Sequence, residues 1–317
     1  MNTTSIFRRA FAAFGLAIMV LITGCATNTM TGRMQVTLGS EQDLIVESAQ
    51  GFAAMKSQYA AKRELVTHAP TIKRINAITN RLIDQAVKYR PDSAAWDWEV
   101  MVVNTPELNA WALPGGKMAI FTGMINLPLT DDEIAQIMGH EIGHALAKHG
   151  LEKKSTRQGA AVLTSIGGAL LGQTGMPLSQ EAVALGASGF IVAPNSRKAE
   201  SEADAMGIEF AARAGYDPKA AVTLWQKMAA KGGATKTGFL DTHPSDGERI
   251  QALSGLHDHM KQLRAESAPM VAGKGKARPT VALDAKNRPE PFNWLGAPKA
   301  MRPDIKVQAP LQLFKAQ

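Results

Sequence analysis

The spacing of apolar and polar residues predicts a chain made mostly of helices, with a small sheet. Apolar residues recur every three to four positions in 40–62 and 70–89, which is the period of an amphipathic helix. Residues 98–103 and 117–122 are rich in strand-forming residues, and a Leu-Pro-Gly-Gly turn precedes the second segment. The expected fold class is therefore α+β, mostly helical, with a small sheet beside the helices.

Residues 130–149 carry the clearest helix signals of the chain. Thr130 and Glu133 fit a capping box, and Gly150 stands where a C-terminal cap is expected. Two later helices are predicted, one over about 196–214 and one beginning near Pro218.

The segment 159–191 is apolar and rich in small residues. Gln173, Pro177 and Glu181 interrupt its apolar runs before they reach the length of a membrane span. This favours a closely packed helical hairpin over an element that touches the membrane.

One helix carries a metal-binding motif. His140, Glu141 and His144 match H-E-x-x-H, in which the two histidines are one helical turn apart and point at the same spot. Neutral imidazole nitrogens are good ligands for Zn²⁺. Glu141 is offset around the helix, so it can act as general base on a water molecule at the metal.

A catalytic zinc site needs a third protein ligand. His149 is rejected, because it lies about 140° around the helix from His144 and one residue before the position that a metzincin would use. Glu200 and Asp204 are four residues apart and share a helix face, whereas Glu202 points elsewhere. On spacing alone this pair fits a solvated acidic face equally well.

These motifs carry a family resemblance. H-E-x-x-H followed about sixty residues later by E-x-E-A-D resembles the gluzincin peptidases that include HtpX and the CAAX prenyl proteases, over roughly residues 40–253. The resemblance implies a minigluzincin-like domain with one zinc ion held by His140, His144 and Glu200. It also implies Glu141 as the base and Asp204 as the carboxylate that holds a ligand imidazole.

Two further elements match the same family. Residues 109–116 are similar to the strand pair beside its cleft, and His243-Pro244 with Arg249 matches its H-P…R element near the metal. The resemblance implies that His243 and Arg249 are catalytic. His243 would either donate to the oxyanion, with Arg249 adding positive charge, or close the open zinc position as a latch. The alternative is a surface histidine with no special role.

The N-terminal segment is typical of a bacterial lipoprotein signal. Arg8 and Arg9 precede an apolar run over 11–22, and small residues then lead to Cys25, the one cysteine of the chain. We expect a signal peptide over 1–24, lipidation of Cys25, and a polar tether over 25–39. Ala26 after the cysteine resembles an outer-membrane address, so the expected location is the periplasmic face of the outer membrane.

The net charge of +7 belongs to the C-terminal tail. Residues 259–317 hold 11 Lys and Arg against 4 Asp and Glu, which leaves 24 of each sign elsewhere. This Pro-rich basic tail is expected to be largely irregular and solvated, and no nucleic-acid partner is expected. The peptidase domain is therefore predicted over 40–258.

The function predicted from these features is zinc-dependent hydrolysis of peptide bonds in extended or misfolded envelope proteins. The substrate is expected to add as a strand along Lys117, Met118, Ala119, Ile120 and Phe121. One alternative is a chaperone or binding lipoprotein for outer-membrane proteins with a latched zinc site. Another is a lipid-anchored scaffold that acts through the basic tail. Intact His140, Glu141, His144 and Glu200 argue against the first alternative, because a non-enzyme has no need of the base Glu141.

Overall fold

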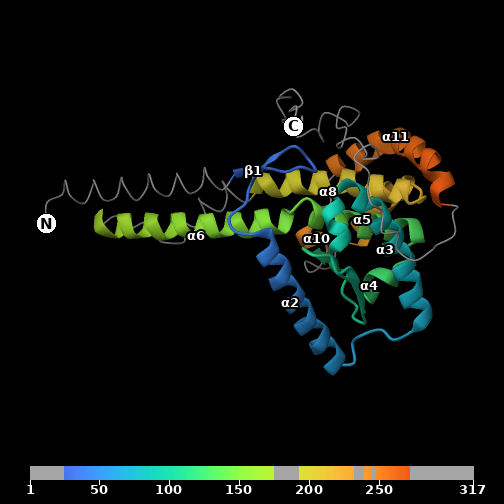
Figure 1. The fold of residues 1–317 in the computed structure, drawn as a ribbon, viewed down its shortest axis with the longest axis horizontal. Coiled ribbons are helices and arrows are strands. Elements are labelled where there is room, and N and C mark those ends of the chain that lie inside the picture. The colour runs from blue at the N-terminus through green and yellow to red at the C-terminus, as the bar shows by residue number, and fades with distance from the viewer. Residues whose placement is uncertain (1–24, 175–192, 232–238, 244–246, 272–317) are drawn as a thin grey trace, which may run out of the picture.

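A three-stranded sheet with a fully buried middle strand lies at the centre of the fold (Figure 1). The computed structural model describes residues 25–174, 193–231, 239–243 and 247–271. Strand β5 (Lys117–Phe121) pairs in parallel with β3 (Glu99–Val103) and antiparallel with β4 (Ala110–Leu113). The β4–β5 turn contains Gly115 and Gly116, both at positive φ, a conformation that glycine adopts without strain.

The position of β5 corrects one prediction from the sequence. Because β5 is hydrogen-bonded to a strand on each side, Lys117–Phe121 offers no free edge to a substrate, and that assignment is wrong. The outer edge of β3 is partly covered, since Val66 N–H donates to Val102 O and Asn104 N–H donates to Glu64 O. The open edge of the sheet is therefore β4.

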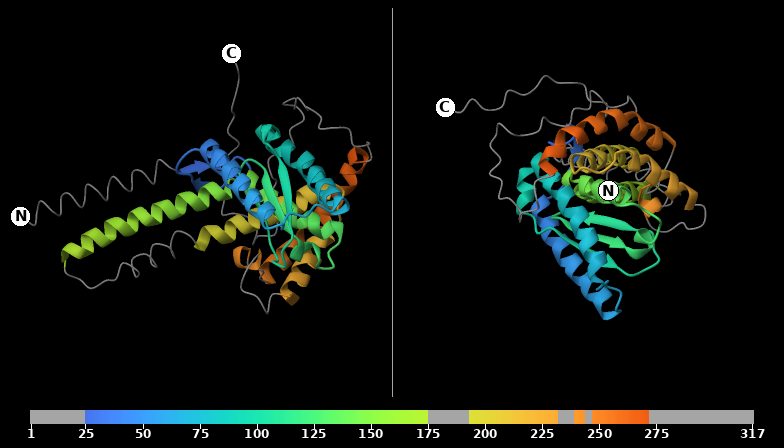
Figure 2. Two further views of the ribbon diagram at one scale, coloured as in Figure 1. Left: turned by 90° about the horizontal axis from the view of Figure 1, so that it is seen from below. Right: turned by 90° about the vertical axis from the view of Figure 1, so that its right-hand side faces the viewer.

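Helices cover both faces of the sheet (Figure 2), and the side chains of β5 point alternately to one face and to the other. Met118 and Ile120 lie in the main core with helices α3 (Ala69–Tyr89) and α5 (Asp131–Leu146). Ala119 and Phe121 face the opposite side, where Phe52 of α2 (Glu41–Ala61) covers them. This period of two is what a strand buried on both faces requires.

Helix α5 is held at its start and crossed at its centre. Its capping box is present, because the Thr130 hydroxyl accepts from Glu133 N–H and the Glu133 carboxylate accepts from Thr130 N–H. Helix α8 (Ala193–Arg213) packs across α5 at glycines. A Cβ on Gly207 would lie 2.7 Å from His140 N, and one on Gly139 would lie 2.8 Å from Gly207 O.

Shorter and outlying elements complete the described chain. They are β1 (Cys25–Thr27), β2 (Met34–Val36), η1 (Pro91–Ala95), α4 (Thr122–Ile125), α6 (His149–Thr174), α9 (Lys219–Lys231), α10 (Phe239–Thr242) and α11 (Gly247–Val271). Helix α6 extends away from the rest of the fold (Figure 1). The mostly helical α+β class predicted from the sequence is confirmed.

Two predicted boundaries differ from the structure. Helix α5 ends at Leu146, since Lys148 adopts a positive φ of 57° and the chain restarts as α6 at His149, so Gly150 is not a cap. Helix α11 continues through residue 258 to Val271, so the first part of the predicted tail is helical. Its apolar residues Leu256, Met260 and Leu263 are buried in the main core, which extends the helix past the expected boundary.

The predicted tether is folded. Within residues 25–39, strands β1 and β2 form an antiparallel hairpin whose polar residues Asn28, Thr31, Arg33 and Gln35 are buried. Sequence polarity suggested solvation, but these side chains find partners inside the protein.

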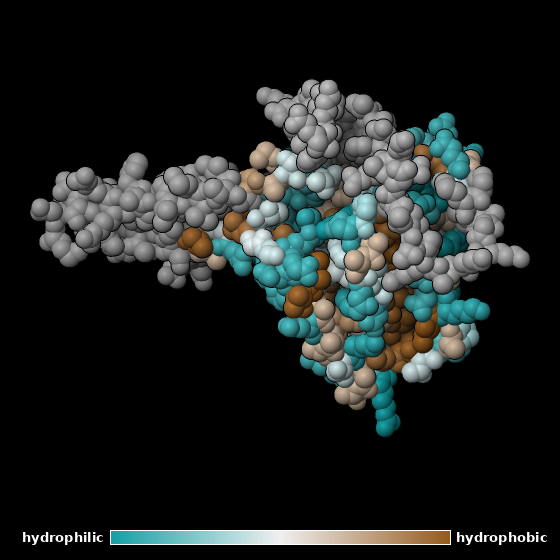
Figure 3. Space-filling model, viewed as in Figure 1, coloured by the Kyte–Doolittle hydropathy of each residue, from teal (hydrophilic) through white to brown (hydrophobic). Residues whose placement is uncertain are grey.

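Several predictions lie outside the described residues. They concern the signal peptide over 1–24, the second half of the hairpin expected over 159–191, Pro244, and the tail after residue 271. Helices within the described ranges do not combine the length and apolar character that a membrane span requires. On the face shown in Figure 3, hydrophobic residues gather below α4, and polar residues cover much of the remaining described surface.

We expect Gly207→Ala to lower the free energy of unfolding by about 1–3 kcal/mol, because the added methyl group forces α8 away from the α5 backbone. The matched control is Gly51→Ala in α2, where a Cβ meets nothing within 4 Å. That change should be neutral or stabilise by up to about 1 kcal/mol through helix propensity. Urea unfolding of both variants measures the difference, and equal effects would contradict the close crossing.

Candidate metal centre

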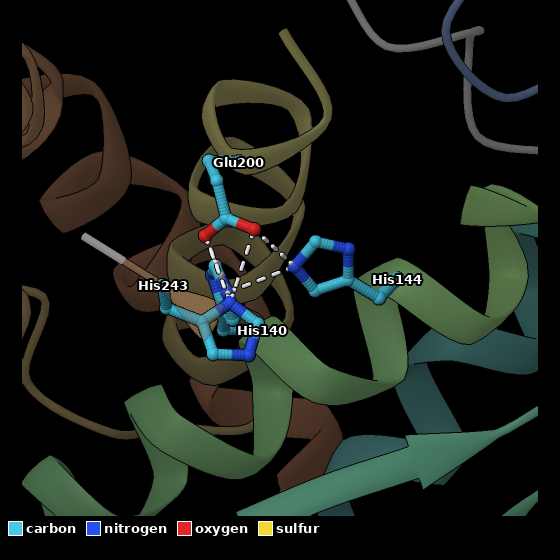
Figure 4. A group of neighbouring side chains, drawn as sticks. All are labelled: His140, His144, Glu200 and His243. Atoms are coloured by element: carbon cyan, nitrogen blue, oxygen red, sulfur yellow. Dashed lines mark hydrogen bonds and ion pairs between the residues drawn. The ribbon is translucent and has the colours of Figure 1, made fainter. Parts of the chain in front are cut away.

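Four side chains from three segments converge on one point (Figure 4). His140 and His144 come from α5, Glu200 comes from α8, and His243 follows α10. One ligand atom from each of the four lies within 4.8 Å of the others. The close crossing at Gly139 and Gly207 brings the Glu200 carboxylate to the two histidines.

The distances between these atoms suit a metal ion. His140 Nε2 lies 3.0 Å from His144 Nε2 and 3.4 Å from Glu200 Oε2, and His144 Nε2 lies 3.2 Å from Glu200 Oε1. His243 Nδ1 lies 3.1 Å from His140 Nε2 and 2.9 Å from Glu200 Oε2. Tetrahedral Zn²⁺ with bonds of about 2.0–2.2 Å separates its ligand atoms by roughly 3.4 Å.

The negative charges around these ligands also favour a cation at this point. Burial lowers the pKa of His144 well below its ordinary value, so its ring is neutral and carries a lone pair. Burial would lower the pKa of His140 too, but hydrogen bonds with Asp204 and Glu200 outweigh burial and raise the pKa to about 9. Burial opposes ionisation of Glu200, yet the surrounding imidazoles hold its pKa well below the usual range. The residues present therefore fit zinc.

Asp204 fixes the orientation of His140. Its Oδ1 lies 2.9 Å from His140 Nδ1, which directs Nε2 of that ring at the metal position. Arg249 grips the same carboxylate with two hydrogen bonds of 2.7 Å, and its guanidinium lies 3.9 Å from the Trp225 ring centre. Asp204 thus contacts the imidazole of His140, as the family resemblance implied. Arg249 contacts Asp204 directly and also lies 3.3 Å from Glu200 Oε2.

Glu141 faces the same point from the other side. Its Oε2 accepts from Ala112 N–H of β4 at 3.2 Å. Its Oε1 is buried, has no hydrogen-bond partner among the described residues, and lies 3.2 Å from His243 Nε2. Burial raises the pKa of this carboxyl group. A buried carboxylate oxygen that accepts no hydrogen bond, beside a metal position, is suited to hold a water molecule and take its proton.

A cleft of about 310 Å³ opens beside these groups. Ala110, Trp111 and Ala112 of strand β4 line it, as do Glu141 and His144. The cleft therefore joins the open edge of the sheet to the metal centre.

Sequence reasoning missed two features of the site. His149, which the sequence analysis excluded as a ligand, lies with Nδ1 2.8 Å from Nδ1 of His144. Trp225 and Phe239 pack against the ring of His140. Neither feature has a local sequence signal, because both depend on contacts between distant segments.

The fold and this centre define a metallopeptidase of the H-E-x-x-H type. The pattern of Peptidase family M48 matches residues 72–257, which is more than half of the chain. The chain belongs to this family, and the resemblance to gluzincin peptidases is thereby confirmed.

Known relatives agree with this membership. Mitochondrial metalloendopeptidase OMA1 of Arabidopsis thaliana is 41% identical over 157 residues, which cover 50% of this chain and 31% of the relative. OMA1 of Schizosaccharomyces pombe is 33% identical over 204 residues, covering 64% and 57%. Metalloprotease YcaL of Escherichia coli is 25% identical over 246 residues, covering 74% and 91%. The aligned region spans about a third to just over half of these two mitochondrial relatives.

We expect Glu200→Gln to weaken zinc binding by more than about 100-fold, because a charged ligand is lost. Asp204→Asn should weaken zinc binding by about 10–100-fold, as is typical of groups that orient a ligand. The matched control is Glu209→Gln, a buried glutamate of the same helix that contacts Tyr89 and Arg213 and not the metal centre. Competition with a chromophoric chelator gives all three affinities. Wild-type affinity in Glu200→Gln would remove Glu200 from the ligand set.

Proposed function

We propose that this protein is a zinc-dependent endopeptidase that cleaves extended or misfolded proteins of the bacterial cell envelope. The observation that carries the proposal is the position of Glu141. Its side chain lines the same cleft as the ligand cluster and the open strand edge, and one of its carboxylate oxygens accepts no hydrogen bond. The names of the relatives, metalloendopeptidase and metalloprotease, support the same reaction class.

Each residue has a defined part in the hydrolysis. Zinc bound by His140, His144 and Glu200 would polarise the scissile carbonyl and acidify a water molecule. Glu141 takes the proton of that water and delivers it to the leaving amine. Asp204 and Arg249 do not line the cleft. Their part is to keep His140 oriented, through the contact of Asp204 with His140 and of Arg249 with Asp204.

The position of His243 is compatible with either of the two roles expected from the sequence. Its Nδ1 lies among the ligand atoms, as a latch requires, and its Nε2 is directed toward Glu141, where a donor to the oxyanion would act. The latch position favours one alternative function, a binding lipoprotein whose zinc site stays closed.

We expect Glu141→Gln to reduce cleavage of an unfolded protein such as casein by about 10²–10⁴-fold, because the general base is lost while the shape of the side chain is kept. Zinc content should not change, since Glu141 is no ligand. Glu209→Gln is again the control and should keep full activity. Rapid cleavage by Glu141→Gln would reject the assigned base. Wild-type protein that binds zinc and casein but cleaves nothing would favour the binding lipoprotein.

The substrate is proposed to lie along β4. Asn109 O accepts from Phe121 N–H of β5, whereas Ala112 N–H points away from β5 toward Glu141. Backbone groups at alternate positions of this segment therefore face the cleft, where an extended peptide can pair with them. Pairing through the backbone binds many sequences, which suits a protease of unfolded proteins.

This arrangement predicts a two-residue period in the substrate. N-methylation of single backbone amides along a peptide substrate should lower kcat/KM by about two- to tenfold at every second position, because one hydrogen bond is lost there. The neighbouring amides, which face solvent, are the built-in control. A loss without this alternation, measured by cleavage kinetics, would argue against pairing with β4.

The location is proposed from the N-terminal sequence. Cys25 is exposed at the first residue of β1, which suits attachment of a lipid to its thiol. Cys25→Ser should then move the protein from the membrane fraction to the soluble periplasm, whereas Ser57→Ala on exposed α2 should leave it in the membrane. Wild-type protein that fractionates as soluble would contradict the lipid anchor.

A further inference from the structure

A buried chain of polar contacts links the N-terminal hairpin to the metal centre. Arg33, in the β1–β2 hairpin, donates from Nε to Glu202 Oε1 at 2.7 Å and from Nη2 to Glu202 Oε2 at 3.1 Å. Glu202 Oε2 lies 2.8 Å from His149 Nε2, and His149 Nδ1 lies 2.8 Å from His144 Nδ1. Arg33, Glu202 and His149 are each less than 10% exposed.

The protons in this series of contacts can be placed so that each donor points away from the metal position, from His144 through His149 to Glu202. A His144 ring that binds metal through Nε2 carries its proton on Nδ1, which then donates to His149 Nδ1. The His149 proton is left on Nε2, where the Glu202 carboxylate accepts it. Arg33 holds that carboxylate with two donors, so each link fixes the orientation of the next.

The same hairpin also binds the end of the ligand helix. Asn28 Nδ2 and Gln35 Nε2 both donate to Ala147 O, at 2.6 and 3.0 Å, immediately after the last residue of α5. Arg33 further donates two hydrogen bonds of 2.6 Å to Glu152 of α6. The hairpin thereby holds α5, α6 and α8 in one arrangement, next to His144.

We infer that Arg33, Glu202 and His149 are positioning residues for the metal ligand His144, so that the N-terminal hairpin completes the metal centre. His140 is oriented by Asp204 and Arg249, and this second chain gives His144 an equivalent support from the opposite side of α8. The inference rests on the proposed zinc site. It assigns a role at that site to the segment that directly follows Cys25.

The test changes His149, because this residue links the hairpin to the ligand. His149→Leu removes both contacts, and zinc affinity should fall by about 10–100-fold. His149→Gln keeps one acceptor and one donor, so its affinity should remain close to that of wild type. Both affinities are measured by chelator competition on the full chain, with thermal unfolding of the metal-free proteins recorded in parallel.

A matched control separates positioning from loss of stability. Tyr89→Phe removes a part-buried hydrogen bond between α3 and Glu209 of α8, away from the contacts of Arg33, Glu202 and His149. It should lower the unfolding temperature of the metal-free protein without changing zinc affinity. A fall in zinc affinity in Tyr89→Phe equal to that in His149→Leu would overturn the inference, because general destabilisation would then account for both.

A double-mutant cycle tests whether the hairpin acts through His149. Arg33→Lys keeps the charge but cannot form the bidentate hydrogen bonds to Glu202. It should therefore weaken zinc binding in the wild-type background. In the His149→Leu background the same change should have no further effect. Fully additive losses, or a His149→Leu protein that binds zinc like wild type, would overturn the inference. Failure of the zinc site itself would appear separately, as unchanged zinc affinity in Glu200→Gln.

Discussion

The contact between the backbones of α5 and α8 sets the geometry on which the metal centre depends. At Gly139 and Gly207 the two helices approach so closely that a methyl group on either residue would collide with the other backbone. This distance places Glu200 and Asp204 within hydrogen-bonding reach of His140, one on each ring nitrogen. A wider crossing would separate the carboxylates from the imidazoles, since neither side chain is long enough to span another layer of atoms.

Burying so many ionisable groups is costly unless each has a partner. Asp204 is paired with Arg249, whose guanidinium is covered by Trp225, and Glu202 is paired with Arg33. Glu200 faces the three histidines, where a bound cation would balance its charge. Among these carboxylates, Oε1 of Glu141 is an oxygen that accepts no hydrogen bond. It is the group that a hydrolytic water molecule would complete.

The sheet connects this centre to a polypeptide. Strand β5 is paired on both sides and packed on both faces, so it serves as a fixed support. Strand β4 lies between that support and the cleft, and Ala112 contacts Glu141 through its backbone. A chain paired with β4 would therefore run past the general base at a defined distance. This is how one small sheet can serve both folding and substrate binding.

The sequence by itself determined the features that depend on local spacing. Helical periodicity places His140 and His144 one turn apart, the capping box marks the start of α5, and E-x-E-A-D identifies Glu200 and Asp204 through a family pattern. Tertiary structure alone decided that β5 is the central strand, that residues 25–39 fold onto the domain, and that His149 lies against His144. These facts rest on pairing between segments up to 169 residues apart, such as Arg33 with Glu202. Periodicity and motifs report on neighbours along the chain, and they carry no information about which distant surface will satisfy a buried charge or cover a strand edge.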